Sequence, residues 1–86
     1  MKSVKLGPYT IPIQRKELVN AAGCWDSDKR IITIVPGMEG AAYWDTLIHE
    51  CVHAISDLHA LGLCEAQVSS LGVGLAQALA PVIVED

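Results

Sequence analysis

Residues 49–53 have the pattern H-E-x-x-H and lie in a stretch whose apolar residues recur with the period of an α-helix. At about 100° per residue, one arc of about 140° contains the side chains of Trp44, Leu47, Ile48, Cys51, Val52, Ile55 and Leu58. His49, Glu50 and His53 fall in the opposite arc, and the two histidines are one helical turn apart. The sequence therefore predicts an amphipathic helix with both histidines and the glutamate on its polar face.

This spacing suits the binding of a metal ion. Two imidazole nitrogens on one turn of a helix can bind the same zinc ion, and a glutamate beside the first histidine can act on a water molecule that the metal activates. We therefore predict Zn²⁺ as the cofactor, His49 and His53 as metal ligands, and Glu50 as the general base of a zinc metallopeptidase. The alternative is a plain solvated face; against it, all three histidines lie within residues 49–59.

A catalytic zinc site requires a third protein ligand and leaves one position open. Glu65 is the favoured candidate because it opens a second predicted helix, at residues 64–80, near the edge of that helix's apolar face. If the two helices pack antiparallel, this edge faces the histidines. The first helix must then loosen by about Leu58, and residues 57–63 must fold back, because a helix rises about 1.5 Å per residue.

Three other residues are alternatives for the third ligand. His59 would reach the metal only if the helix ended near Ser56 in a residue with positive φ, which serine does not favour. Its other predicted role is that of a hydrogen-bond donor near the open coordination position. Asp57 is a fallback ligand, and Cys64 is a further alternative because it adjoins Glu65.

Size and composition restrict the class of protein. The chain has 86 residues, which predicts a single domain over residues 1–86. The net charge is −4 and no basic patch is formed, so nucleic acid is not an expected partner. No apolar run reaches about 18 residues, and no long apolar stretch marks a signal peptide, so we expect no membrane span and a cytoplasmic location. Cys24, Cys51 and Cys64 are expected as free thiols, with Cys51 buried.

Turn residues divide the N-terminal part into short strands. We expect strands at residues 4–6, 9–13, 23–25 and 30–35. The first two form a hairpin about Gly7-Pro8, and Pro12 is expected to make the second an edge strand or to end it early. The predicted fold class is α+β: a small, mainly antiparallel sheet from the N-terminal 35 residues, packed on two C-terminal helices.

The helix ends carry their own signals. The first helix is predicted to begin between Gly40 and Asp45, with Asp45 as its cap or in its first turn. The second is predicted to end before Pro81. Its expected apolar face consists of Val68, Leu71, Gly72, Leu75 and Leu79. Glycine costs about 1 kcal/mol relative to alanine in a helix, and the missing side chains of Gly72 and Gly74 would let another helix approach closely.

The strand before the zinc motif, the helix that carries it and the glutamate on the next helix together resemble the small phage-type metallopeptidases related to the ImmA/IrrE family. The segments that carry the resemblance are residues 23–25, 30–35, 46–55 and 65–68, with Leu71, Leu75 and Leu79. The resemblance implies a zincin-like minimal core with a gluzincin-like site, in which His49, His53 and Glu65 bind zinc and Glu50 is the base. The gap between His53 and Glu65 is shorter than in larger members of the family, and substrate identity does not carry over.

The predicted mechanism uses an extended peptide or protein as substrate. We expect the substrate to add to the exposed edge of residues 31–35, which places a backbone carbonyl over the metal. Glu50 would take a proton from the water molecule and pass it to the leaving amine. Tyr43, His59 and Arg15 are the candidate donors to the oxyanion.

Two other functions stay open at this point. A non-catalytic, zinc-binding phage-type protein would act as a host-interaction module, with Cys64 or His59 as a fourth ligand. A metal-free helical protein would use its apolar helix faces to dimerise. The small size is compatible with a homodimer or a complex with a host protein, in the host cytoplasm if the protein is phage-encoded.

Overall fold

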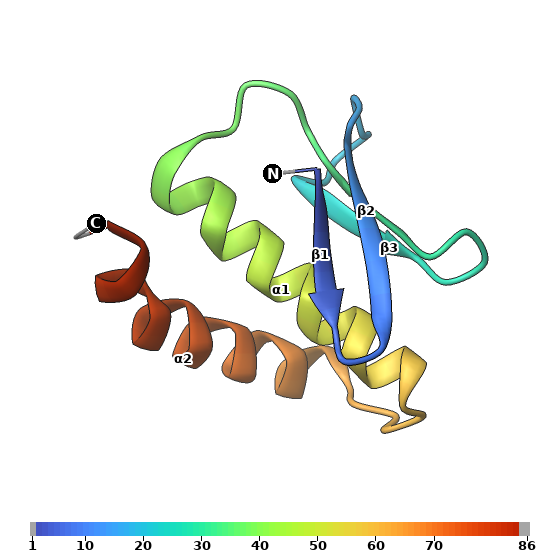
Figure 1. The fold of residues 1–86 in the computed structure, drawn as a ribbon. Coiled ribbons are helices and arrows are strands. Elements are labelled where there is room, and N and C mark those ends of the chain that lie inside the picture. The colour runs from blue at the N-terminus through green and yellow to red at the C-terminus, as the bar shows by residue number, and fades with distance from the viewer. Residues whose placement is uncertain (1, 85–86) are drawn as a thin grey trace.

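The computed structural model describes residues 2–84, in which a four-stranded sheet is followed by two helices (Figure 1). This confirms the predicted α+β class. The elements are β1 (Ser3–Leu6), β2 (Tyr9–Arg15), β3 (Gly23–Asp26), β4 (Ile31–Ile34), α1 (Gly40–Leu58) and α2 (Glu65–Val84). Neither helix within residues 2–84 combines the length and the apolar character that a membrane span requires.

The strands lie in the order β1-β2-β4-β3. β1 pairs with β2 and β3 pairs with β4 in antiparallel register, whereas β2 and β4 are parallel. β4 therefore has a partner on each side, and β1 and β3 are the strands at the two edges of the sheet. The prediction that a peptide adds to the edge of residues 31–35 is wrong, because the backbone groups on both sides of β4 are already paired.

Pro12 neither ends β2 nor places it at an edge, contrary to the prediction. The first part of β2 pairs with β1, and its last three residues pair with β4. The backbone N–H of Ile13 donates to the carbonyl of Lys2 at 2.9 Å, so the Pro12 nitrogen faces the other side of the strand. Pairing with β4 begins only at Ile13, and the missing N–H of Pro12 therefore removes no ladder bond.

α1 lies between the sheet and α2, which runs back along it (Figure 1). The core between α1 and the sheet contains Ile11, Ile32, Ile34 and Leu47, each at most 1% exposed. Burial of a side chain of this size stabilises the fold by about 1.5–3 kcal/mol. Because α1 has neighbours on two sides, part of its predicted polar face is also covered, and Glu50 is buried.

The N-terminus of α1 differs from one expectation. The helix begins at Gly40, within the predicted interval, and its N-cap is Glu39, whose side chain makes no capping hydrogen bond. Asp45 is the sixth residue of the helix, and no acidic residue lies in the first turn. Asp45 is therefore neither the cap nor a first-turn residue. The reason is that the helix begins more than one turn before Asp45.

The C-terminus of α1 reverses the chain, as the Glu65 prediction required. Residue Leu58 is the last of the helix and Ala60 has a positive φ of 53°. The N–H of Ala60 donates to the carbonyl of Asp57 at 3.2 Å, and the N–H of Leu61 donates to the carbonyl of Ser56 at 2.8 Å. These two bonds form a Schellman motif, with alanine at the position that glycine usually occupies.

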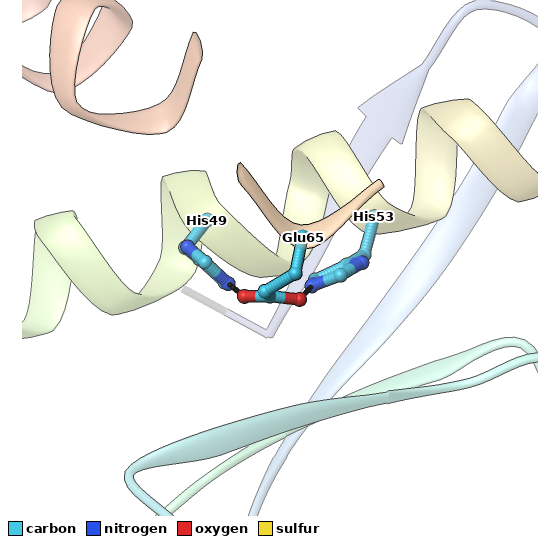
Figure 2. Close-up of side chains that lie close together, drawn as sticks. All are labelled: His49, His53 and Glu65. Carbon is cyan, nitrogen blue, oxygen red and sulfur yellow. Dashed lines mark ion pairs between the residues drawn. The ribbon is translucent and has the colours of Figure 1, made fainter. Parts of the chain in front are cut away.

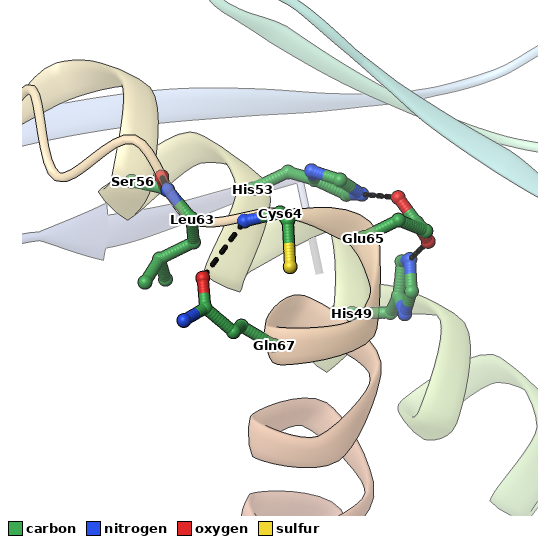
Figure 3. A network of polar contacts seen from close by, with 7 residues as sticks. All are labelled: His49, His53, Ser56, Leu63, Cys64, Glu65 and Gln67. Carbon is green, nitrogen blue, oxygen red and sulfur yellow. Dashed lines mark hydrogen bonds and ion pairs between the residues drawn. The ribbon is translucent and has the colours of Figure 1, made fainter.

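Side chains then fold the connection back toward α1 (Figure 3). The hydroxyl oxygen of Ser56 accepts the N–H of Leu63 at 2.9 Å. The side-chain oxygen of Gln67 accepts the N–H of Cys64, also at 2.9 Å, and this closes the start of α2 as in half of a capping box. α2 consequently begins at Glu65, and the side chain of Ser56 holds the connection against the end of α1.

The face of α2 that packs on α1 is narrower than predicted. Val68 and Gly72 are buried, whereas Leu71, Leu75 and Leu79 are 39–48% exposed. The three leucines were expected in the same face, but the close approach of α2 at Gly72 turns them away from α1. The predicted end before Pro81 is also wrong, since α2 continues to Val84. Pro81 lacks a backbone N–H and so removes one helical hydrogen bond, but the N–H groups of the residues after it can still donate to the helix.

Replacing Ala60 by glycine tests the strain at the end of α1. We expect Ala60→Gly to stabilise the protein by about 0.5–1 kcal/mol. Relief of the positive φ, which costs an L-residue about 1–2 kcal/mol, favours the variant. The greater conformational entropy of glycine in the unfolded state offsets part of that stabilisation. Urea unfolding followed by circular dichroism measures the change. The control Ala78→Gly, at an exposed helical position, should lose about 1 kcal/mol. Destabilisation by Ala60→Gly would contradict the Schellman assignment.

Candidate metal centre

The structure brings His49, His53 and Glu65 together (Figure 2). The Nε2 atom of His49 lies 3.1 Å from one carboxylate oxygen of Glu65, and the Nε2 atom of His53 lies 3.0 Å from the other. The ligand atoms of the three residues all lie within 4.8 Å of one another. In a tetrahedral zinc site with bonds of about 2.0–2.2 Å, neighbouring ligand atoms are about 3.3–3.6 Å apart. Two imidazoles and one carboxylate at these separations fit such an ion after small side-chain movements.

Glu65 reaches the histidines because it shares a helix face with the two residues that dock α2. Val68 follows it by three positions and Gly72 by seven, which places all three on one side of the helix. At Gly72 an added Cβ would lie 3.5 Å from the Cα of His49 and 3.8 Å from its Nδ1. The backbone of α2 therefore packs directly against His49. As predicted, this glycine lets the helices approach closely, whereas Gly74 has no such neighbour.

The three alternative ligands lie elsewhere. The ring of His59 packs edge-on against Tyr9, with centroids 6.1 Å apart, because α1 ends before His59 and the positive φ comes after it. The carboxylate of Asp57 accepts a hydrogen bond from the indole nitrogen of Trp25 at 3.1 Å. Cys64 is exposed and is not among the clustered donors within residues 2–84.

Glu50 lies next to the cluster and is 8% exposed. Burial raises the pKa of its carboxyl above the ordinary value, while the nearby His49 and His53 act in the opposite direction. The carboxylate makes no hydrogen bond or ion pair with any residue that the structure describes. Among the described residues, however, every side-chain oxygen that is fully shielded from solvent has a hydrogen-bond partner. Its oxygens must therefore contact the solvent of the adjoining cavity.

A glycine on β3 makes room for this glutamate. A Cβ at Gly23 would lie 2.7 Å from the Cγ2 of Thr46, 3.0 Å from the carbonyl oxygen of Thr33 and 3.4 Å from the Cγ of Glu50. Only glycine lets β3 pass this close to α1. From the sequence, Gly23 was predicted only as the first residue of a strand. Its role beside Glu50 depends on a contact between residues far apart in the chain, which no local pattern indicates.

The cluster opens into a cavity of about 360 Å³, here called the central cavity, and β3 forms one of its walls. Its lining consists of Gly23, Cys24, Trp25, His49, Glu50, His53 and Glu65. The N–H of Val35 donates to the carbonyl of Ala22, so alternate residues of β3 point their backbone groups toward β4. The N–H and C=O groups of Gly23 and Trp25 therefore face the free edge of the sheet.

The candidate oxyanion donors do not line the central cavity. The guanidinium of Arg15 donates to the carbonyls of Val35 and Met38, both at 3.0 Å, and lies 4.5 Å from the centre of the Tyr43 ring. Arg15 and Tyr43 thus hold the segment between β4 and α1. His59 packs on Tyr9, as described above. None of the three lies beside the cluster, because each is engaged on another side of the sheet or helix.

The neighbouring Cys51 faces the core rather than the cavity. It is 8% exposed and packs with the isoleucines of the sheet, as expected from its place on the apolar face. Burial raises the pKa of its thiol to about 11, so the thiolate that would bind a metal is disfavoured.

Comparisons of the chain with protein-family models, with curated proteins and with solved structures found no match. The resemblance to the ImmA/IrrE peptidases therefore stays a prediction that depends on the motif and its spacing. The geometry of the cluster is independent of that resemblance.

Adding a methyl group at Gly23 tests the close contact between β3 and α1. We expect Gly23→Ala to destabilise the protein by about 1–3 kcal/mol, because the new Cβ overlaps Thr46 and the Thr33 carbonyl. Thr46→Ser removes the closest of these atoms and should recover part of the loss in the double variant. Gly74→Ala is the matched control: nothing lies within 4 Å, and helix propensity should stabilise it by up to about 1 kcal/mol. Full stability of Gly23→Ala in urea unfolding would contradict the packing described.

Proposed function

We propose that this protein is a zinc-dependent peptidase in which His49, His53 and Glu65 hold the metal and Glu50 is the general base. The observation that carries the proposal is the meeting of two imidazole nitrogens at one carboxylate, beside a buried glutamate that has no partner of its own. A structural ion pair would explain the meeting of the two imidazoles with Glu65. It does not explain why a second carboxylate is kept buried and unpaired in the same cavity.

The donor set supports a catalytic rather than a structural zinc site. Structural sites take four protein ligands, whereas catalytic sites take three and leave one position for water or substrate. Three donors cluster within residues 2–84, and the cavity adjoins them. When bound, zinc would activate a water molecule and polarise the carbonyl of the substrate.

The residues of the chain supply the remaining parts of the reaction. Glu50 follows His49 on α1 and lines the same cavity, so its carboxylate can take the proton of the attacking water and return it to the leaving amine. The imidazoles and Glu65 fix the position of the metal relative to this carboxylate. Gly23 keeps β3 close enough to exclude bulk water from one side of Glu50.

The substrate in this proposal is an extended peptide that adds to the edge of β3. Gly23 and Trp25 offer backbone donors and acceptors along the wall of the cavity, and an added strand would pair with them. This replaces the edge at residues 31–35, which is paired. The side chains of such a peptide would alternate between the groove and solvent.

The proposal includes kinship with the ImmA/IrrE peptidases and a cytoplasmic location. The first is supported by the motif together with the glutamate on the next helix. The second is supported by the three cysteines, whose odd number and spacing do not suggest a disulfide framework. The exposed leucines of α2 are compatible with a homodimer or a host partner, without favouring either.

Zinc binding can be measured on protein that carries no affinity tag. We expect one zinc ion per chain, and removal of His49, His53 or Glu65 by alanine should weaken binding by at least about 100-fold, because each supplies one ligand atom. At a zinc concentration of 100 times Kd, the parent should gain about 2.7 kcal/mol of stability. His59→Ala and Asp57→Asn are matched controls that should bind zinc like the parent. Equal loss in His59→Ala would overturn the ligand assignment.

Replacing the proposed base separates catalysis from metal binding. Glu50→Gln keeps the size of the side chain and removes the proton acceptor, so it should retain zinc and lose about 10²–10⁴-fold or more in peptide hydrolysis. Product formation from a peptide mixture, followed by mass spectrometry, measures the loss. Zinc-loaded parent protein that cleaves no peptide, with a fourth protein ligand detected on the metal, would favour the non-catalytic host-interaction module instead.

A further inference from the structure

Three cavities along β3 adjoin one another through shared lining residues, and together they are here called the β3 groove. The central cavity shares Gly23, His49 and Glu50 with a cavity of about 400 Å³ between α1 and α2, the interhelical cavity. On its other side it shares Trp25 and His53 with a cavity of about 530 Å³ near the end of α1. The cluster of histidines and Glu65 consequently lies in the middle of a groove that follows the edge strand.

The β3 groove is lined by acidic residues and by no Lys or Arg among the side chains that the structure describes. Its carboxylates are Asp45, Glu50, Asp57 and Glu65. The cause lies in the sequence: all six Lys and Arg residues fall within residues 2–30, whereas seven of the ten acidic residues follow residue 30. A bound dication would offset two of the four charges, so the groove stays negative.

The interhelical cavity has the polarity of a long cationic side chain. Its walls include the small apolar residues Ala22, Gly72, Val73 and Ala76, and its polar groups include the exposed Asp45 and Gln77. Asp45 has no ion-pair partner in residues 2–84. Lysine and arginine place apolar methylene groups against apolar surface and keep the charged end at a polar one. Glu50 lines the same cavity, is 8% exposed and makes no hydrogen bond or ion pair within residues 2–84, so it adds a second carboxylate to these polar groups.

The distance between Asp45 and His49 along α1 relates the interhelical cavity to the bond that would be cleaved. Asp45 precedes His49 by four residues, which is about 6 Å along the helix. A strand advances by about 3.3 Å per residue. A substrate residue that reaches Asp45 therefore lies within two residues of the one whose carbonyl is at the metal cluster.

We propose that the β3 groove selects extended peptides that carry a lysine or arginine within two residues of the cleaved bond, with Asp45 as the counter-charge of that side chain. This inference rests on the proposed peptidase function and adds the class of substrate to it. The groove attracts the cation over its whole length, and the interhelical cavity fixes where the side chain lies. Acidic peptides are repelled by the same carboxylates.

Peptides that differ at a single position test this specificity. The set has an alanine and serine background with Lys, Met or Glu at each position in turn, Met being the neutral match of Lys in length. Zinc-loaded parent protein should cleave the best Lys peptide with a kcat/KM at least about fivefold above that of its Met counterpart and further above that of the Glu peptide. The ratio should fall as salt rises from 50 to 500 mM, because screening weakens exposed charge pairs.

Charge reversal at Asp45 locates the selectivity. In Asp45→Lys the preference for the Lys peptide over the Glu peptide should invert. The matched control is Glu17→Lys, an exposed loop residue outside the groove, which changes the net charge equally and should leave the preference unchanged. An unchanged preference in Asp45→Lys, or equal inversion in Glu17→Lys, would overturn the inference.

Binding measurements keep the two proposals distinct. Fluorescence anisotropy of the same peptides on zinc-loaded Glu50→Gln reports affinity without hydrolysis. Asp45-dependent binding of the Lys peptide, with no cleavage by the parent, would support the groove specificity and refute the peptidase. Cleavage of all peptides at equal rates would support the peptidase and refute the specificity. Absence of both binding and cleavage would refute both.

Discussion

The packing of α2 against α1 at Gly72 is the contact on which the candidate site depends. It holds the backbone of α2 against His49, and the same helix face carries Glu65 to both imidazoles. The chain must reverse within residues 59–64 for this to happen. Ser56 makes the reversal by accepting the N–H of Leu61 on its carbonyl and that of Leu63 on its hydroxyl. The positive φ of Ala60 is the local cost, on the order of 1–2 kcal/mol, and helix packing offsets it.

Charge accumulates in the site in a way that a purely structural cluster would avoid. Two carboxylates, Glu50 and Glu65, lie beside one another, and only Glu65 is paired with the histidines. Burial of the unpaired Glu50 is unfavourable unless a cation or a proton compensates it. The proposed peptidase function would account for its retention beside two imidazoles, because groups arranged for chemistry often give up local stability. β3 lies directly across the cavity, which in the proposed function would give the site access to an extended peptide.

The acidic groove and the helical cluster have a common origin in the distribution of charge along the chain. The sheet half contains every Lys and Arg, and the helical half contains none. Folding places the helices, not the sheet, around most of the cavity walls. The surface of the β3 groove is therefore negative, although the net charge of the chain is only −4.

Elements whose signals are local could be predicted from the residues alone. The turn at Gly7-Pro8, the β-branched run that became β4, the apolar stripe of α1 and the placement of His49, Glu50 and His53 outside that stripe all follow from residues within one or two turns of each other. Glu65 was also predicted, because it opens α2 near the edge of that helix's apolar face, which faces α1 when the two helices pack antiparallel.

Features that depend on partners distant in the chain became visible only in the folded protein. The order of strands put β3 rather than β4 at the edge, because hydrogen bonding between strands is set by the whole sheet. The burial of Glu50, the need for glycine at residue 23 and the exposure of the leucines of α2 each arise from close packing between separate elements. Periodicity gives the direction of a side chain relative to its own helix or strand, but the neighbour that it meets is fixed by how the layers stack.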